Sequence, residues 1–351
     1  MTLTLVHSNA YVIEMAQASA TITSHDNLGT NIFVPIKPSS FGDVTGLDYH
    51  SPTRSLIAGL SSAGSGSGNF LSIDTNSAVT SWSGVNQSVG ELKFAIVKQS
   101  ANGFTNGAIY FNSESNSAFP GVIGRVSSNG SAWSTNWATL TNEPLLLQGG
   151  FYVDQTGVFS NNLIVVSGVD TNDGARIWQV DAAGNATNLA FLPLVHCEGV
   201  ITLSNDVARW GPWAGKILTG AENTAGCPSA DLIFAINTNG AVASFDLGIS
   251  AEHFDLIPAD QDLYLSLEGA ADSIVKLPRT LLSQYVGDLL ITQGGRYGGL
   301  AHSPGFFIVR WDGSRFTKRG IDLQFYSKGA YNIRGSGEIE GVSFAPIDSA
   351  P

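Results

Sequence analysis

The sequence predicts an all-β protein, a six-bladed β-propeller closed by its C-terminal strand. Two observations favour this fold class: a composition typical of many short strands joined by tight turns, and a recurring unit of alternating apolar runs. The chain has 351 residues, of which 40 are glycine, 43% are hydrophobic and only 13% are charged. Turn sequences such as "SNG", "TNDG" and "NTNG" separate the apolar runs.

The repeating unit is clearest in its second and third strands. These are recognisable six times, in segments that start at residues 55, 108, 163, 216, 262 and 289. The segment from 262, "LYLSLEGAADSIVKLP", is shortened. Six units of three to four strands predict six blades around a central channel, and a partial seventh blade is the alternative.

Each blade is expected to open with an innermost strand. The candidates are "TGLDYH" at 45, "ELKFAIV" at 91, "GGFYVD" at 149, "CEGVITL" at 197, "EHFDLI" at 252 and "EGVSFAP" at 340. The unit from 289 has no evident opening strand before it, and the run at 340 has no second strand after it. We therefore expect the C-terminal strand to complete a blade begun elsewhere, which removes free sheet edges. Residues 1–44 are expected to add a closing strand, "NIFVPI", or a plug.

No Pro-rich, Ser-rich or charged linker divides the chain, which predicts one propeller domain over residues 30–351. Residues 1–29 are interpreted as an N-terminal extension or the remnant of a signal segment. They include the small-residue sequence "AQASA" but lack a basic start, and His7 and Glu14 interrupt the apolar stretch. Sequons at Asn86, Asn129 and Asn185 favour a secreted or secretory-pathway glycoprotein.

The charge balance limits the partners. A net charge of −12 argues against nucleic acid and anionic membranes, which are bound by clustered Lys and Arg. The chain has no run of 18 apolar residues, so no membrane span is expected. Neither a phosphate-binding glycine loop nor a GxSxG nucleophile motif occurs. The expected partner is a small apolar molecule, and the sequence does not specify an oligomeric state.

Carboxylates recur where the opening strands begin. Aligned on the apolar residue that follows, the opening positions are Thr45, Glu91, Gly149, Glu198, Glu252 and Glu340. Four carboxylates around one axis repel one another, and their pKa values rise unless they are paired or neutralised. Ca²⁺ or Mg²⁺ is one way to neutralise them. The alternatives are a site without a cofactor, and glutamates that only cap strand ends and face channel water.

Three histidines are expected near the same mouth. His196 precedes Glu198 closely, His253 follows Glu252, and the loop "GGRYGGLAHSPG" carries Arg296, Tyr297 and His302. A histidine beside a glutamate is suited to general acid–base catalysis, although an ordinary hydrogen-bonding role is the alternative for each. No HxH or HExxH spacing supports zinc. The candidate catalytic residues are Glu198, Glu252, His253 and Glu340, and the candidate substrate-binding residues are Glu91, His196, Arg296, Tyr297 and His302.

The two cysteines are expected at one blade of the rim. Cys197 begins an opening strand, and Cys227 lies in the loop between the second and third strands of the same blade. A disulfide between them would attach this loop to the channel mouth. Two free thiols are the alternative.

The sequence also resembles known propellers. The "EGV" openings are similar to those of gluconolactonase-type propellers, which implies a divalent metal at the mouth. The stretch 195–320, with "HCEGV", "RWGPWAGKILTGAEN", "IFAINTNG" and "FIVRWDG", resembles a group of secreted propellers of fungi and bacteria. Among fungal members it is similar to the hetero-Diels–Alderases of tropolone sesquiterpenoid pathways. That resemblance implies a cofactor-free enzyme that cyclises a quinone-methide-type intermediate with an alkene, and it transfers no residue roles.

A pericyclase of this kind needs an apolar pocket that holds the reactants in near-attack geometry and a few polar groups. Two other functions remain open. The first is a metal-dependent, lactonase-like hydrolase or a sugar lyase, in which the carboxylates form the metal or acid–base site. The second is a carbohydrate-binding propeller without catalysis. Its sites should recur in each blade, and the differing residues at the six mouths argue against it.

Overall fold

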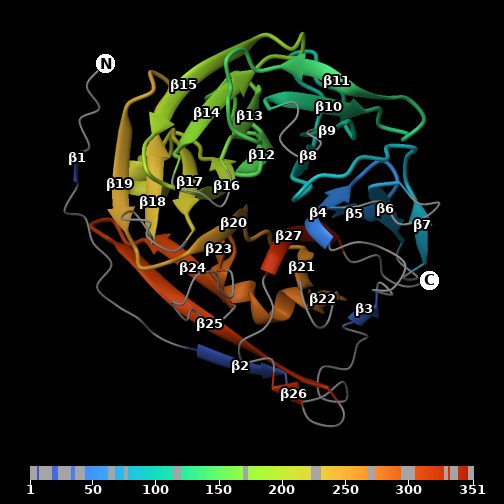
Figure 1. The fold of residues 1–351 in the computed structure, drawn as a ribbon. Coiled ribbons are helices and arrows are strands. Elements are labelled where there is room, and N and C mark those ends of the chain that lie inside the picture. The colour runs from blue at the N-terminus through green and yellow to red at the C-terminus, as the bar shows by residue number, and fades with distance from the viewer. Residues whose placement is uncertain are drawn as a thin grey trace.

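The computed structural model describes residues 6–7, 18–22, 33–35, 44–61, 68–74, 78–113, 120–168, 173–222, 231–267, 273–293, 305–327, 331–332 and 339–346. Within these residues six small sheets surround one axis and form a six-bladed β-propeller (Figure 1). Six blades, and not seven, are therefore present in the described part of the chain. The innermost strands lie around the centre of Figure 1, and the outermost strands lie at its rim.

The first three blades follow one another along the chain, each as an antiparallel sheet of four strands. From the channel outward, blade 1 comprises β4 (Val44–His50), β5 (Ser55–Leu60), β6 (Phe70–Ile73) and β7 (Val79–Ser81). Blade 2 comprises β8 (Phe94–Ile96), β9 (Ile109–Asn112), β10 (Val122–Val126) and β11 (Trp133–Thr139). Blade 3 comprises β12 (Gly150–Val153), β13 (Leu163–Val166), β14 (Ala175–Val180) and β15 (Ala186–Leu192).

The last three blades draw on distant parts of the chain. Blade 4 comprises β16 (Cys197–Thr202), β17 (Ile217–Ala221), β18 (Leu232–Ile236) and β19 (Val242–Asp246). Blade 5 comprises β20 (Ala251–Leu256), β23 (Leu289–Gln293), β24 (Gly305–Trp311) and β25 (Phe316–Ser327), with β26 (Tyr331–Asn332) beside β25. Blade 6 comprises β27 (Ile339–Pro346), β21 (Gln261–Leu267), β22 (Ser273–Leu277) and β3 (Phe33–Pro35).

The ring is closed by both ends of the chain. The C-terminal strand β27 pairs with β21 from Gln261 to Leu267, and β3 from the "NIFVPI" segment pairs with β22. Closure by the C-terminal strand is therefore confirmed. The expectation that the unit from 289 lacks an opening strand was wrong, because β20 pairs with β23 of that unit. The chain leaves blade 5 after β20, forms the middle of blade 6 with β21 and β22, and then returns.

Two N-terminal strands lengthen the outer edges of neighbouring blades. β1 (Val6–His7) pairs in parallel with β19, and β2 (Ala18–Ile22) pairs in parallel with β25. The division between residues 1–29 and 30–351 remains a prediction.

The core consists of apolar layers between adjacent blades. The second strand of a blade has both faces covered, so β5, β13 and β17 are buried along their whole length. Trp213 stacks on Phe316 between blades 4 and 5 with ring centroids 3.9 Å apart.

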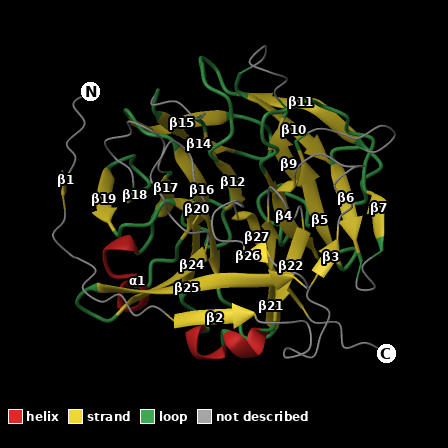
Figure 2. Ribbon diagram, turned by 60° about the horizontal axis from the view of Figure 1, so that its bottom comes forward, coloured by secondary structure: helices red, strands yellow, loops and turns green. Residues whose placement is uncertain are grey.

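The short helices are α1 (Val207–Trp210), η2 (Gly211–Trp213), η3 (Arg279–Leu281) and η4 (Ser283–Tyr285). They lie in the lower part of Figure 2. The described residues include no helix long and apolar enough to cross a membrane.

Candidate functional site

Four inner strands carry a β-bulge near their start, and in β16 the bulge lies between Glu198 and Ile201. In β4, β20 and β27 the extra, unpaired residues are Thr45, Glu252 and Glu340, as the register shifts on either side of each show. A bulge redirects the side chain at the end of a paired strand. Both bulged glutamates are nearly fully buried, at 4% and 6% exposure, so they do not face solvent.

The "EGV" opening of blade 4 allows two inner strands to approach closely. Gly199 has a φ of +63°, and a Cβ atom placed there would lie 2.7 Å from the carbonyl oxygen of Glu252. Only glycine avoids both the backbone strain and this contact. The motif therefore brings the Glu198 strand against the Glu252 strand of the next blade.

Lys93 lies at the centre of the glutamates. Its Nζ atom is 2.8 Å from Glu198 Oε2, 3.0 Å from Glu91 Oε2 and 3.4 Å from Glu340 Oε2. Lys93, Glu198 and Glu340 are almost entirely buried, whereas the Glu91 side chain keeps 29% exposure. Glu91 is therefore the member of this group most open to solvent.

His196 connects the lysine-centred group to a fifth glutamate. Its Nε2 atom lies 3.3 Å from Glu198 Oε1, and its Nδ1 atom lies 2.8 Å from Glu222 Oε2. Glu222 directly follows β17, and its backbone N–H donates to the carbonyl of His196. We call Glu91, Lys93, His196, Glu198, Glu222, Glu252 and Glu340 the mouth cluster.

Burial gives two carboxyl groups of the mouth cluster unusual proton affinity. Burial raises the pKa of Glu198 to about 7, although Lys93 and His196 favour its charged form. Burial, reinforced by the charges of Glu222 and Glu198, holds the pKa of Glu252 well above its usual range. Burial therefore favours the protonated form of Glu252, and near pH 7 Glu198 is divided between its two forms.

The neighbouring carboxylates favour the charged forms of the two basic groups of the mouth cluster. Burial alone would lower the pKa of Lys93, but the charges of Glu198, Glu91 and Glu340 raise it well above the ordinary value. Burial likewise opposes the charge of His196, and its contacts with Glu198 and Glu222 raise its pKa well above the usual value. Burial favours neutral Glu222, yet the contact with His196 outweighs it and lowers that pKa.

A second polar group lines the channel beyond the mouth cluster. Lys98 pairs with Asp48, and Ser343 donates to Asp48 Oδ1 over 3.2 Å. Burial lowers the pKa of His253 to about 4, with Asp48, Lys93 and Lys98 the charges that act on it. Burial also raises the pKa of Asp255 to about 7. His253 is thus a neutral imidazole inside the channel, and its proposed catalytic role stays a prediction.

The glutamates of the mouth cluster are predictable from the sequence, but their partners Lys93 and Glu222 are not among the predicted site residues. The structure brings together Glu91, His196, Glu198, Glu252 and Glu340, whose functional roles remain predictions. Lys93 lies two residues after Glu91 and just before β8, outside any repeated motif, so no sequence signal pointed to it. Glu222 follows the second strand, where antiparallel pairing places it opposite His196.

Several predicted site residues lie outside the described part of the chain. These are Arg296, Tyr297, His302 and Cys227, so neither the loop that carries the first three nor the predicted disulfide is described. Cys197 begins β16 and is fully buried.

Three side chains of the mouth cluster could hold a metal ion. One ligand atom each from His196, Glu198 and Glu222 lies within 4.8 Å of the others. Nitrogen and carboxylate ligands suit a transition metal better than Ca²⁺ or Mg²⁺. The Lys93 ammonium already contacts Glu198, and a cation at this position would meet its repulsion.

The chain matches no family model and none of the curated proteins. Among solved structures it is similar to an auxiliary nutrient binding protein from Bacteroides thetaiotaomicron, with 10% identity and a TM-score of 0.42. That match covers 78% of this chain and 58% of the other, so the chain spans little more than half the length of that protein.

Two enzymes give similar matches. An oligogalacturonate lyase from Vibrio parahaemolyticus has 12% identity and a TM-score of 0.41, over 82% of this chain and 78% of its own. A fructofuranosidase from Schwanniomyces occidentalis has 8% identity and a TM-score of 0.39, over 80% and 62%. At these values the likenesses do not indicate a function for this protein.

Proposed function

We propose that the protein is an enzyme that acts on a small, largely apolar molecule with the mouth cluster as its acid–base machinery. One observation carries this proposal. The Glu198 carboxyl group, with a pKa of about 7, lies between the Lys93 ammonium at 2.8 Å and the His196 ring at 3.3 Å. A group that gains and loses a proton near neutral pH is suited to general acid–base catalysis.

The roles of the neighbouring groups follow from their charges. Lys93 supplies a fixed positive charge that stabilises negative charge developing on a substrate oxygen. His196 contacts Glu198 and Glu222 through its two ring nitrogens and can pass a proton between them. Protonated Glu198 is a hydrogen-bond donor in surroundings with little water, where such a bond is strong.

The reaction that we propose is a hetero-Diels–Alder cyclisation of a quinone-methide-type intermediate with an alkene. One carbon–carbon and one carbon–oxygen bond form, and the π bonds of the heterodiene and alkene are rearranged, without net transfer of protons or electrons. Negative charge builds on the carbonyl oxygen as the heterodiene accepts electron density. A hydrogen bond from protonated Glu198, or from Lys93, strengthens as that charge develops.

The test uses an ortho-quinone methide generated in place from a hydroxybenzyl alcohol, with a panel of cyclic alkenes. The spontaneous reaction gives racemic product, so chiral chromatography separates catalysis from background. We expect an excess of one enantiomer and a rate that falls as pH rises through about 7, where Glu198 loses its proton. Glu198→Gln should react more slowly and without this pH dependence, and exposed Asp312→Asn should match the wild type. Racemic product from the wild type with every alkene would exclude the cyclisation.

A metal-dependent hydrolase is the second candidate, favoured by the convergence of His196, Glu198 and Glu222. The discriminating experiment measures hydrolysis of a lactone panel by protein dialysed against EDTA and then supplied with Zn²⁺, Mn²⁺ or Ca²⁺. Metal-restored hydrolysis that Glu222→Gln abolishes would replace the acid–base proposal. Cyclisation that persists in EDTA would support the acid–base proposal.

A further inference from the structure

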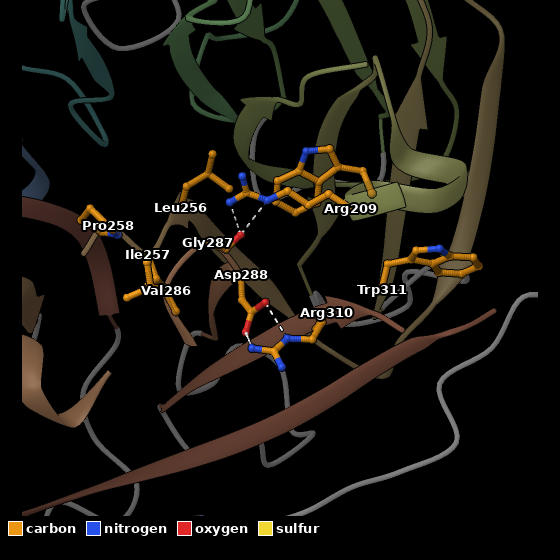
Figure 3. Close-up of a pocket in the computed structure, with 10 residues that line it drawn as sticks. Arg209, Leu256, Ile257, Pro258, Val286, Gly287, Asp288, Arg310 and Trp311 are labelled. Atoms are coloured by element: carbon orange, nitrogen blue, oxygen red, sulfur yellow. Dashed lines mark hydrogen bonds and ion pairs between the residues drawn. The ribbon is translucent and has the colours of Figure 1, made fainter. Parts of the chain in front are cut away.

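A hollow lies where blades 4 and 5 meet, lined by α1 and by segments of blade 5 and including no residue of the mouth cluster. Its volume is about 700 Å³, within the size range of small-molecule sites. Figure 3 shows residues of its lining, which come from α1, from the end of β20, from the segment before β23 and from the end of β24. Trp210, Leu256, Ile257, Pro258, Val286 and Trp311 make most of this lining apolar.

Arg209 supplies a positive charge at this hollow. Its Nε atom donates over 3.0 Å to the carbonyl of Gly287, its Nη2 atom donates to the same oxygen, and its guanidinium lies 4.6 Å from the centre of the Trp210 ring. Gly287 has a φ of +90°, and a Cβ atom there would lie 2.7 Å from Nη2. The glycine therefore permits this contact, which fixes the direction of the guanidinium.

The charge of Arg209 has no anionic partner within the part of the chain that the structure describes. The other arginine of the hollow, Arg310, donates to both carboxylate oxygens of Asp288, over 2.8 and 2.7 Å. That pair is neutral as a unit. Among the lining residues, Arg209 is therefore the one whose charge is not compensated. It shares the hollow with the indole rings of Trp210 and Trp311 and with aliphatic side chains.

We propose that this hollow, which we call the Arg209 pocket, binds a small apolar molecule that carries a carboxylate. A planar guanidinium held by its Nε edge still offers Nη1 to a carboxylate, a pairing with strong directional preference. The apolar walls favour a hydrophobic body over an inorganic anion. The mouth cluster is rich in carboxylates and repels such a ligand, which separates the two sites. This proposal is independent of the cyclase activity.

The test is isothermal titration calorimetry with naphthoate and with naphthylmethanol, its uncharged counterpart. We expect saturable binding of both, with naphthoate about tenfold tighter, as expected for one charge-assisted hydrogen bond at an accessible site. Arg209→Gln should remove this difference and leave naphthylmethanol binding unchanged. Val286→Asp should abolish naphthoate binding, because it places a negative charge on the exposed wall of the pocket.

Arg315→Gln is the matched control, since Arg315 is also accessible but pairs with Asp312 and does not line the pocket. It should bind both probes like the wild type. Equal affinity for the two probes, no saturable binding of naphthoate, or an unchanged preference in Arg209→Gln would overturn the proposal. Competition by inorganic phosphate as effective as that by naphthoate would also overturn it, because the apolar walls would then contribute nothing.

Discussion

The Lys93 ammonium lies 2.8 Å from the Glu198 carboxylate, and only 9% and 3% of the two side chains are exposed. A buried charge that loses its partner is strongly destabilising, even where the pair itself adds little net stability. Lys93 also contacts Glu91 and Glu340, so one ammonium offsets the charges of glutamates from three blades. An internal cation therefore lies where the sequence alone suggested Ca²⁺ or Mg²⁺.

Replacing this cation should weaken the fold. In Lys93→Met the glutamates around it lose their compensating charge, and we expect a loss of about 3–5 kcal/mol in unfolding free energy at pH 8. The loss should shrink at pH 5, where Glu198 is protonated. Urea unfolding followed by tryptophan fluorescence measures both values.

The matched control is Lys216→Met, since Lys216 forms no ion pair with any residue that the structure describes. Its unfolding free energy should stay close to that of the wild type at both pH values. A Lys93→Met protein that is as stable as the wild type at pH 8 would mean that another cation compensates the glutamates.

Glu198 should make stability depend on pH. Its pKa is about 7 in the folded protein and 4.5 when unperturbed. Its contribution to the unfolding free energy is therefore fully present below pH 4.5 and is lost as pH rises through 7. Glu198→Gln cannot ionise. The unfolding free energy of this variant, relative to wild type, should therefore increase by about 2–3 kcal/mol between pH 5 and pH 8.

The control for this comparison is Asp312→Asn, because hydrogen bonds from Ser314 and Arg315 lower the pKa of Asp312 to about 2. Asp312 therefore does not titrate between pH 5 and pH 8, and its variant should differ from wild type by a constant amount. A constant difference for Glu198→Gln as well would show that Glu198 is already ionised at pH 5.

The fold could be predicted from the sequence because each blade repeats one local pattern. Apolar alternation and turn residues identify strands without reference to distant parts of the chain. The pairing of β20 with β23 could not be predicted in this way. From the local sequence, β21 could pair with either β20 or β27. It pairs with β27, and this choice depends on the closure of the whole ring.

The candidate site could be predicted only in part, for a related reason. Glu198 and Glu340 share the "EGV" sequence, so their equivalent positions are readable from the repeat. Lys93 and Glu222 occur once each, outside any repeated motif. Their relation to Glu198 arises from three-dimensional contacts between blades 2 and 4 and between two strands of blade 4, which no spacing in the sequence encodes.

The cysteines provide a further prediction. Cys197 is fully buried at the start of β16, and Cys227 lies outside the described residues. A disulfide between them would close a loop of about 30 residues, worth roughly 3–4 kcal/mol in the chain-entropy model. Mass spectrometry of unreduced peptides should find the linked pair in protein secreted from a eukaryotic host. Two alkylated thiols in natively purified protein would exclude it, and with it one reason to expect the secretory pathway.

Ring closure gives the last prediction. β27 pairs with β21 along seven registered positions and also carries Glu340 into the mouth cluster, whereas β3 contributes only three residues at the outer edge of the same blade. Deleting residues 338–351 should therefore expose the inner edge of blade 6 and abolish cooperative thermal unfolding, because an unpaired edge strand promotes aggregation. Deleting residues 1–36 removes β1, β2 and β3 from outer edges only, and the shortened protein should still unfold cooperatively at a lower melting temperature. Differential scanning calorimetry and light scattering measure both effects. If the C-terminal deletion melts like the full chain, or if the N-terminal deletion is the more damaging, β27 is not the strand that closes the ring.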